Sequence, residues 1–212
     1  MKSLKRLLRA TTTRTETASR PSHVVVGLRN PGADYEATRH NLGGEVLEAL
    51  LSARGETLSR GPSRVRALVA QTGVGADRHL LAVPTTFMNE SGSAVVSLLS
   101  YFKADVGDLL VIHDDIDLPF GRLRIQVGGG SGGHNGVRSL ERSLGTKEFS
   151  RLKVGVGRPP GSMAPADFVL RHFTKSERPE VDLMVGDAAD VVDLWFTDRV
   201  RAQELAARRG KE

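Results

Sequence analysis

HVVVGLRNPGADYEATRHNLGGEVLEALLSA, residues 23–53, carries more structural information than any other stretch of this chain. Its first part, 23–28, is a short apolar run that predicts a buried strand. Its last part, 38–53, repeats leucine and valine at helical spacing and predicts a helix with one apolar face. Between them, Pro31 favours an extended conformation for Asn30, and the glycine that follows supports a tight turn. A strand, a turn and a helix in this order are typical of an α/β domain.

The same alternation of short apolar runs and helical patterns continues to the end of the chain. The further strands are expected at 65–71, 79–83, 109–113, 122–127 and 151–156, and the further helices at 91–103, from about Asn135, and at 177–208. No internal boundary is visible in the pattern. We therefore expect one α/β domain over residues 23–212.

Residues 1–22 differ from the rest of the chain in charge and pattern. They hold six basic residues and one acidic residue, whereas the remaining 190 residues carry 24 of each sign, so this segment supplies the formal net charge of +5. We expect a basic, disordered N-terminal extension. An RNA-contacting arm, a membrane-surface segment and an organellar import segment all fit its short amphipathic start.

Composition excludes several classes of chemistry. The 212 residues contain no cysteine, which rules out disulfides, thiolate metal sites and cysteine nucleophiles. No apolar run approaches the roughly 18 residues of a membrane span. Charge is uneven: 122–158 holds eight basic and two acidic residues, and 177–198 holds seven acidic residues and one basic residue. The basic stretch is a candidate surface for a polyanion, although two ordinary solvated faces would have the same composition.

Ligands of open α/β sheets bind beyond the carboxyl ends of the strands, so polar residues there are candidate site residues. His40 begins a helix after the first strand, and Asp114 lies in the acidic cluster 113–117 that ends another. A carboxylate that orients a neutral histidine makes a general base, with no need for a serine or cysteine nucleophile. A Mg²⁺ site is the alternative interpretation of the acidic cluster.

Two more segments lie at predicted strand-to-helix turns. Asn89 offers an amide donor and acceptor to a carbonyl substrate, and Ser91 is expected to be a helix N-cap rather than a nucleophile. The segment GGGSGGHNG, residues 128–136, matches both G-x-G-x-x-G and G-x-S-x-G, but a run this rich in glycine satisfies almost any glycine pattern. A nucleotide-dependent enzyme that uses this loop is therefore a minor alternative. The bare backbone allows close approach of a ligand to the helix N-terminus that follows.

Together these motifs are specific: the sequence resembles bacterial-type peptidyl-tRNA hydrolase over about residues 23–208. Four ordered stretches carry the resemblance: VVGLRNPGADYEATRHNLG (25–43), VPTTFMNESG (83–92), HDDIDLPFG (113–121) and GGGSGGHNGVRS (128–139). The resemblance implies one α/β domain with a twisted, mixed, mostly parallel β-sheet flanked by helices. It also implies a cytoplasmic monomer that uses no cofactor and no metal and releases tRNA from peptidyl-tRNA.

The resemblance also assigns roles to individual residues. The catalytic residues would be His40 as the base, Asp114 as its orienting carboxylate and Asn30 as an oxyanion donor. The substrate-binding residues would be Tyr35, Met88, Asn89, His134 and Asn135. The acceptor stem, the 3′ CCA end and the 5′ phosphate of the tRNA would be the partner, with Arg124, Lys153 and Arg151 as its basic contacts.

Three features depart from the family pattern. Gln126 occupies a position that usually supplies the basic partner of Lys153, Arg29 replaces a small residue, and 161–165, at the expected lid, aligns loosely. A second hypothesis comes from the same fold: a non-catalytic RNA-binding homologue, such as an organellar group II intron splicing factor. The presence of His40, Asp114, Asn30 and Asn89 together favours the hydrolase.

Overall fold

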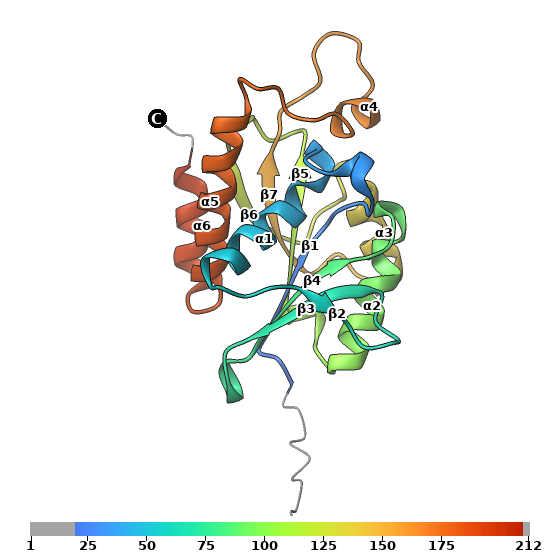
Figure 1. Ribbon diagram of the computed structural model, residues 1–212, viewed down its shortest axis with the longest axis vertical. Coiled ribbons are helices and arrows are strands. Elements are labelled where there is room, and N and C mark those ends of the chain that lie inside the picture. The colour runs from blue at the N-terminus through green and yellow to red at the C-terminus, as the bar shows by residue number, and fades with distance from the viewer. Residues whose placement is uncertain (1–19, 210–212) are drawn as a thin grey trace, which may run out of the picture.

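The computed structural model describes residues 20–209 and contains a seven-stranded mixed sheet in the order β2-β3-β4-β1-β5-β7-β6 (Figure 1). The four central strands are parallel: β4 (His79–Pro84), β1 (His23–Gly27), β5 (Leu109–Asp115) and β7 (Ser150–Gly155). The outer strands are antiparallel to their neighbours: β2 (Ser59–Arg60), β3 (Ala67–Thr72) and β6 (Leu123–Val127). The fold class expected from the sequence is confirmed.

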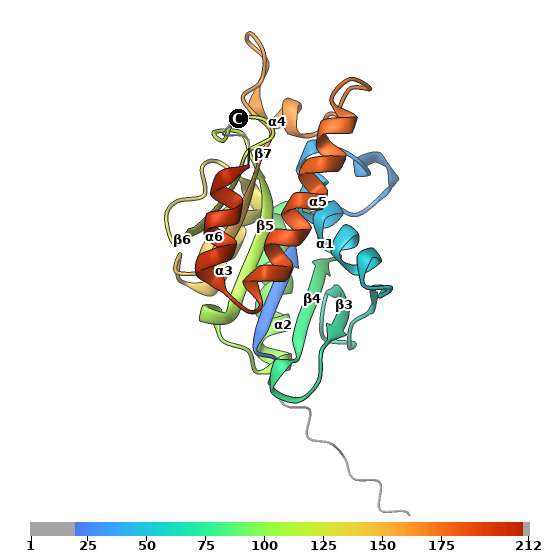
Figure 2. The ribbon, with the colours of Figure 1, turned by 90° about the vertical axis from the view of Figure 1, so that its left-hand side faces the viewer.

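Helices cover both faces of the sheet and divide the core into two layers. One face packs against α1 (Leu42–Ala53), α5 (Arg178–Trp195) and α6 (Arg199–Arg208), which lie in front of the sheet in Figure 2. The other face packs against α2 (Ser91–Phe102) and α3 (Asn135–Leu144). The central strands are apolar on both faces for this reason, and they appear in the sequence as continuous apolar runs.

Glycines bring the start of α1 directly onto the sheet. A Cβ atom on Gly27 would overlap the carbonyl oxygen of Gly43, and a Cβ atom on Gly43 would overlap the carbonyl oxygen of Ile112. Only glycine allows this approach of helix and strand backbones. It places the short 3₁₀ turn η2 (Arg39–Asn41), which precedes α1, at the ends of β1 and β5.

The prediction of one helix over 177–208 is wrong. The chain leaves α5 after Trp195 and starts α6 at Arg199, where Asp198 Oδ1 caps the new helix by accepting a hydrogen bond from the backbone N–H of Arg201 (3.0 Å). Neither glycine nor proline marks the break, and apolar residues of both helices pack into the same core layer. The apolar pattern therefore continues across it.

Other local expectations also needed correction. The helix expected from residue 38 begins as η2, and the short strand β2 was not expected; a short helix, α4 (Pro165–Val169), lies between β7 and α5. Ser91 does not cap α2: it is the first residue of the helix, after Glu90, and its hydroxyl is buried without a partner among the described residues.

The predicted extension 1–22 falls almost entirely outside the described residues. Of its last part, Arg20 pairs with Asp105 and Asp108, and the backbone N–H of Ser22 donates to the carbonyl of Arg78 (2.8 Å). Residues 20–22 thus already contact the domain. No helix in the described part of the chain combines the length and apolarity that crossing a membrane requires.

Candidate active site

The site lies where the carboxyl ends of β1, β4 and β5 meet. These strands are parallel, and β1 lies between the other two. The chain leaves β1 into α1 on one face of the sheet and leaves β4 into α2 on the other face. Such a reversal opens a crevice at the strand ends, which is where open α/β sheets bind ligands.

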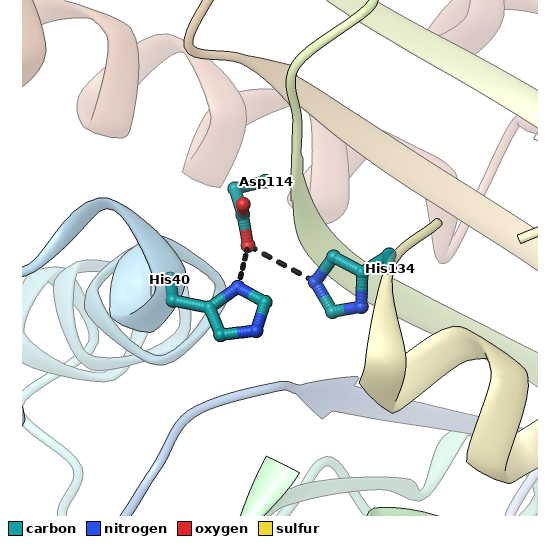
Figure 3. A group of neighbouring side chains, drawn as sticks. All are labelled: His40, Asp114 and His134. Carbon is teal, nitrogen blue, oxygen red and sulfur yellow. Dashed lines mark hydrogen bonds and ion pairs between the residues drawn. The ribbon is translucent and has the colours of Figure 1, made fainter. Parts of the chain in front are cut away.

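Two histidines meet on one carboxylate oxygen in this crevice (Figure 3). His40 Nδ1 lies 2.9 Å from Asp114 Oδ1, and His134 Nε2 lies 3.0 Å from the same oxygen. All three residues are buried. His40 lies in η2, Asp114 lies in β5, and His134 is the N-cap residue of α3, so three separate segments build the cluster.

Hydrogen bonding assigns the tautomers of both rings. His134 Nδ1 accepts from the backbone N–H groups of Gly136 (3.1 Å) and Val137 (3.2 Å), so the proton of this ring is on Nε2 and is donated to Asp114. Asp114 in its ionised form can only accept, so His40 donates from Nδ1. The lone pair of His40 Nε2 is therefore left to take a proton.

The electrostatics distinguish the two histidines. Burial opposes a charge on His40, but the charge of Asp114 and its hydrogen bond outweigh it and raise the pKa of His40 above its ordinary 6.5. For His134 burial dominates, and its pKa is lowered. Burial also opposes ionisation of Asp114, yet His40 and His134 hold its pKa well below the usual range. Asp114 is thus an anion, His134 is neutral, and His40 is the histidine that gains a proton.

A third histidine, His113, lies behind this cluster. Its ring is 4.7 Å from that of His134, and its Nδ1 donates to the backbone carbonyl of Asp114 over 2.6 Å. Nε2 is buried and has no partner among the described residues. Burial lowers the pKa of His113 to about 3, so this ring stays neutral and presents an acceptor.

Asn30 is held by two neighbouring segments. Its backbone N–H donates to Asn41 Oδ1 (2.8 Å), and Asn41 Nδ2 donates back to the Asn30 carbonyl (3.0 Å). The backbone N–H of Met88 donates to Asn30 Oδ1 (2.8 Å), which leaves the Asn30 Nδ2 group as the donor end of the amide. Asn41 is adjacent to His40 in η2, so the amide of Asn30 is fixed relative to the histidine.

A cavity of ≈ 450 Å³ opens beside the cluster. One wall is the glycine-rich loop with Asn135, the opposite wall is α4 and its flanks, and His40, His113 and Asp114 lie between them. The remaining lining residues are Asp115, Ile116, Ser131, Gly132, Gly133, His134, Ala164, Pro165, Ala166 and Val169. The cavity therefore joins the candidate base to the exposed amide of Asn135.

The other predicted substrate residues lie outside this cavity. Asn89 is exposed in η4 (Met88–Glu90). Tyr35 is half-buried and packs edge-on against Phe87, with ring centroids 6.2 Å apart, and Phe87 is 52% exposed. The side chain of Met88 is buried in the core, so its backbone rather than its thioether serves the site.

The glycine-rich loop has to cross the sheet to reach the site. β6 is antiparallel to β7, so β6 ends near the amino ends of the parallel strands, and residues 128–134 run from there back to the site at the carboxyl ends. Arg151 fastens the loop on the way: its guanidinium donates to the carbonyls of Gly129 (2.7 Å) and Gly130 (2.9 Å). Glycine is favoured at 129, where φ is +83°, a backbone conformation that other residues rarely adopt.

The predicted basic contacts differ in accessibility. Arg124 is exposed and is the cross-strand partner of Lys153. Lys153 Nζ lies 2.7 Å from Asp115 Oδ2 and 3.4 Å from Gln126 Oε1, so its charge is partly engaged. Arg151 differs from the expectation, because the residue is fully buried and its guanidinium holds the glycine-rich loop instead of facing solvent.

His40, Asp114 and His134 also form a group, found among residues 20–209, whose possible metal-ligand atoms lie within 4.8 Å of one another. Two imidazoles and a carboxylate are ligands that zinc accepts. In this structure the two nitrogens that face Asp114 donate hydrogen bonds to its oxygen.

Sequence reasoning missed several residues that shape the site. Asn41 and His113 are next to predicted residues, and only the fold shows that their side chains turn inward. Asp115 could be found as part of the acidic cluster. Arg39, which is 4% exposed, carried no signal because arginine in a sequence suggests a solvated surface.

Comparison with known proteins gives one consistent family. The sequence profile of the family described as "Peptidyl-tRNA hydrolase" matches residues 24–211. The chain is similar to the peptidyl-tRNA hydrolase of Kineococcus radiotolerans, with 49% identity over 175 residues that make up 80% of this chain and 88% of that protein. It is 50% identical over 172 residues to the peptidyl-tRNA hydrolase of Mycobacterium tuberculosis, or 81% of this chain and 89% of that one.

Solved structures agree with the sequence relatives. The crystal structure of peptidyl-tRNA hydrolase from Acinetobacter baumannii superimposes with a TM-score of 0.81 at 30% identity, covering 90% of this chain and 97% of that one. The similarity thus extends over nearly the whole domain.

Proposed function

This chain belongs to the peptidyl-tRNA hydrolase family, and from that premise we propose that it hydrolyses peptidyl-tRNA with His40 as the general base. The bond cleaved is the ester between the terminal carbonyl of a peptide, or of an N-blocked aminoacyl group, and the 3′-terminal ribose of tRNA. The reaction is that of a carboxylic ester hydrolase that recycles tRNA from prematurely released peptidyl-tRNA. The observation that carries the assignment of the base is the 2.9 Å hydrogen bond from His40 Nδ1 to Asp114.

In the proposed mechanism, water attacks the ester carbonyl directly. His40 Nε2 takes a proton from the water as the new carbon–oxygen bond forms, and Asp114 stabilises the imidazolium. When the ester bond breaks, His40 returns that proton to the ribose oxygen that leaves. General-base assistance of this kind typically contributes about 10²–10⁴ in rate.

Asn30 would stabilise the oxyanion that forms on the carbonyl oxygen. Its Oδ1 is already engaged by the backbone of Met88, so Nδ2 is the end of the amide that can donate. Loss of one well-placed oxyanion donor typically costs about 10²–10³ in rate.

The remaining predicted residues would bind the substrate around this centre. We assign Asn89 and Asn135 to the main chain of the peptide and the terminal ribose, and Tyr35 to the rim of the site. His134 would act mainly by holding Asp114, and Met88 through its backbone contact with Asn30.

For the tRNA itself, we propose contacts to the acceptor stem, the 3′ CCA end and the 5′ phosphate. Arg124 is exposed and Lys153 lies beside it, which supports a clamp formed by these two side chains. Arg151 would support the clamp indirectly through the loop that it fastens.

The non-catalytic RNA-binding alternative receives no support from the comparisons, because the relatives named above are peptidyl-tRNA hydrolases. The assembled base, carboxylate and cavity also favour an enzyme. We propose that the domain over 23–212 works as a cytoplasmic monomer and that residues 1–22 are an appendage to it.

A direct test is the release of free tRNA from a defined N-acetylated aminoacyl-tRNA by the purified protein. We expect turnover with catalytic amounts of protein. Tight binding of tRNA without release would support the binding protein instead.

A further inference from the structure

One wall of the active-site cavity belongs to a segment with little regular structure. Residues 156–177, here called the cover segment, connect β7 to α5 and rise above the strand ends at the top of Figure 1, where α4 lies. Ala164, Pro165, Ala166 and Val169 of this segment line the cavity opposite the glycine-rich loop. The position of the cover segment therefore sets the width of the cavity.

A single side chain, Arg39, makes four polar contacts with the later part of this segment, residues 171–177. Its guanidinium donates to the backbone carbonyls of Arg171 (3.2 Å) and His172 (2.8 Å). Its other terminal nitrogen lies 2.9 Å from each carboxylate oxygen of Glu177. This nitrogen is shared between the two oxygens, and hydrogen bonds between charged groups are stronger than those between neutral groups.

Two aromatic rings of the cover segment complete the contact. The guanidinium carbon lies 4.4 Å from the ring centroid of Phe168 and 4.6 Å from that of Phe173, a distance at which cation–π attraction operates. The backbones are joined too, since the N–H of Arg39 donates to the carbonyl of Arg171 (3.1 Å) and Thr38 forms a β-bridge with His172.

Arg39 directly precedes His40 in η2. The turn that presents the base and the wall that closes the cavity are therefore fastened to each other through one buried side chain. Burial lowers the pKa of His40 and Asp114 raises it. The contacts of Arg39 instead fix where the cover segment sits.

We propose that Arg39 is a positioning residue, which holds the cover segment against the His40 turn and so completes the cavity that binds the substrate. The expected effect on substrate affinity rests on the proposed hydrolase function, whereas the expected effect on the position of the cover segment does not. Loosening the wall reduces affinity for the substrate, because the wall contacts the bound molecule and not the reacting atoms.

The test uses the full chain with Arg39→Met, which keeps an apolar stem against the two rings and removes all side-chain donors but leaves the backbone hydrogen bond to Arg171. Arg178→Met is the matched control: Arg178 follows the cover segment, but its side chain pairs with Glu45 (2.9 Å) and Asp182. Hydrogen exchange and steady-state kinetics on N-acetylated aminoacyl-tRNA are measured for both.

For Arg39→Met we expect amide exchange in 164–173 to be at least about tenfold faster, with the sheet still protected. The KM should rise about fivefold or more, with kcat within about twofold and the pH dependence of kcat/KM unchanged. Arg178→Met should match the wild type in all of these. Glu177→Gln, which removes only the charge of the carboxylate partner, should give a smaller change in the same direction and serves if Arg39→Met does not fold.

Three results would overturn the proposal: unchanged exchange in 164–173, equal loss of protection across the sheet, or an unchanged KM despite faster exchange. A fall in kcat with a displaced pH profile would show that Arg39 acts on His40 itself, which also contradicts it. If the wild type proved inactive, the proposed function would fail while the exchange data still decided whether Arg39 holds the cover segment.

Discussion

His134 donates a hydrogen bond from Nε2 to Asp114 Oδ1 over 3.0 Å, on the same oxygen that receives His40. The other nitrogen of His134 is held by the backbone of α3, so this donor has a fixed direction. One carboxylate is thus shared between a histidine that stays neutral and a histidine that takes a proton. The helix N-terminus, through His134, takes part in setting the basicity of His40.

Asp114→Asn should lower the pKa of His40. Asp114 raises that pKa against burial, so removing its charge leaves burial to dominate. The acidic limb of kcat/KM, where His40 becomes protonated, should therefore move to lower pH, and the plateau should fall by roughly 10²–10⁴. A pH profile of kcat/KM between about pH 5 and 9 measures both effects. An acidic limb at the wild-type position would contradict the coupling of His40 to Asp114.

Two substitutions at His134 separate its two contacts. His134→Ala removes both the cap on α3 and the donor to Asp114, whereas His134→Asn keeps a cap acceptor but is too short to reach the carboxylate. Both variants lose the hydrogen bond to the Asp114 carboxylate, and hydrogen bonds to a charged group typically contribute about 1.5–3 kcal/mol to the free energy of unfolding. Alanine should cost about 1 kcal/mol more than asparagine, because only alanine also loses the helix cap. Urea denaturation gives these values.

In both His134 variants, Asp114 loses one hydrogen-bond donor, so its carboxylate should raise the pKa of His40 further. The acidic limb of kcat/KM should therefore move to higher pH in each. If only His134→Ala moved the limb, the effect would come from the cap and not from the hydrogen bond to Asp114.

Arg124→Ala and Lys153→Ala should weaken tRNA binding in a salt-dependent way. Each phosphate contact that is lost should reduce the slope of log affinity against log salt by about 1. Lys153→Ala also leaves Asp115 without its partner at 2.7 Å, which adds repulsion for phosphate near the site. Titration of tRNA at several salt concentrations tests this, and unchanged affinity at low salt would dismiss the clamp.

Arg151→Met should behave differently from those two variants. It removes donors from the carbonyls of Gly129 and Gly130, and hydrogen bonds of a charged group typically contribute about 1.5–3 kcal/mol each. The melting temperature should fall while the salt slope of tRNA binding stays as in the wild type. A reduced slope with unchanged stability would restore Arg151 as a direct phosphate contact.

The proximity of His40 to the carboxylates of 113–117 could be predicted because the ends of strands and helices can be recognised in the sequence, and the resemblance singled out Asp114. Apolar runs locate β1 and β5, and parallel strands bring His40 and Asp114 to one edge of the sheet. The bond from His134 to Asp114 could not be predicted, because it depends on the path of 128–134 back across the sheet.

The two buried arginines were also beyond reach of the pattern. Arg39 and Arg151 each hold one wall of the cavity, and in each the terminal nitrogens donate to backbone carbonyls while the guanidinium lies near aromatic rings. Such partners are distant in sequence, and an arginine alone indicates only a charged surface. The division of 177–208 into two helices also escaped prediction. Both helices place apolar residues in the same core layer, so the apolar pattern continues across the break between them.

The central claim is that His40 is the general base, and the most direct test is hydrolysis of N-acetylated aminoacyl-tRNA by the wild type and by His40→Ala, each with and without a chelator. The wild type should release tRNA at the same rate with and without the chelator. His40→Ala should lose about 10²–10⁴ in rate while keeping its fold and its affinity for tRNA. A folded variant that hydrolyses the ester at the wild-type rate would contradict the account.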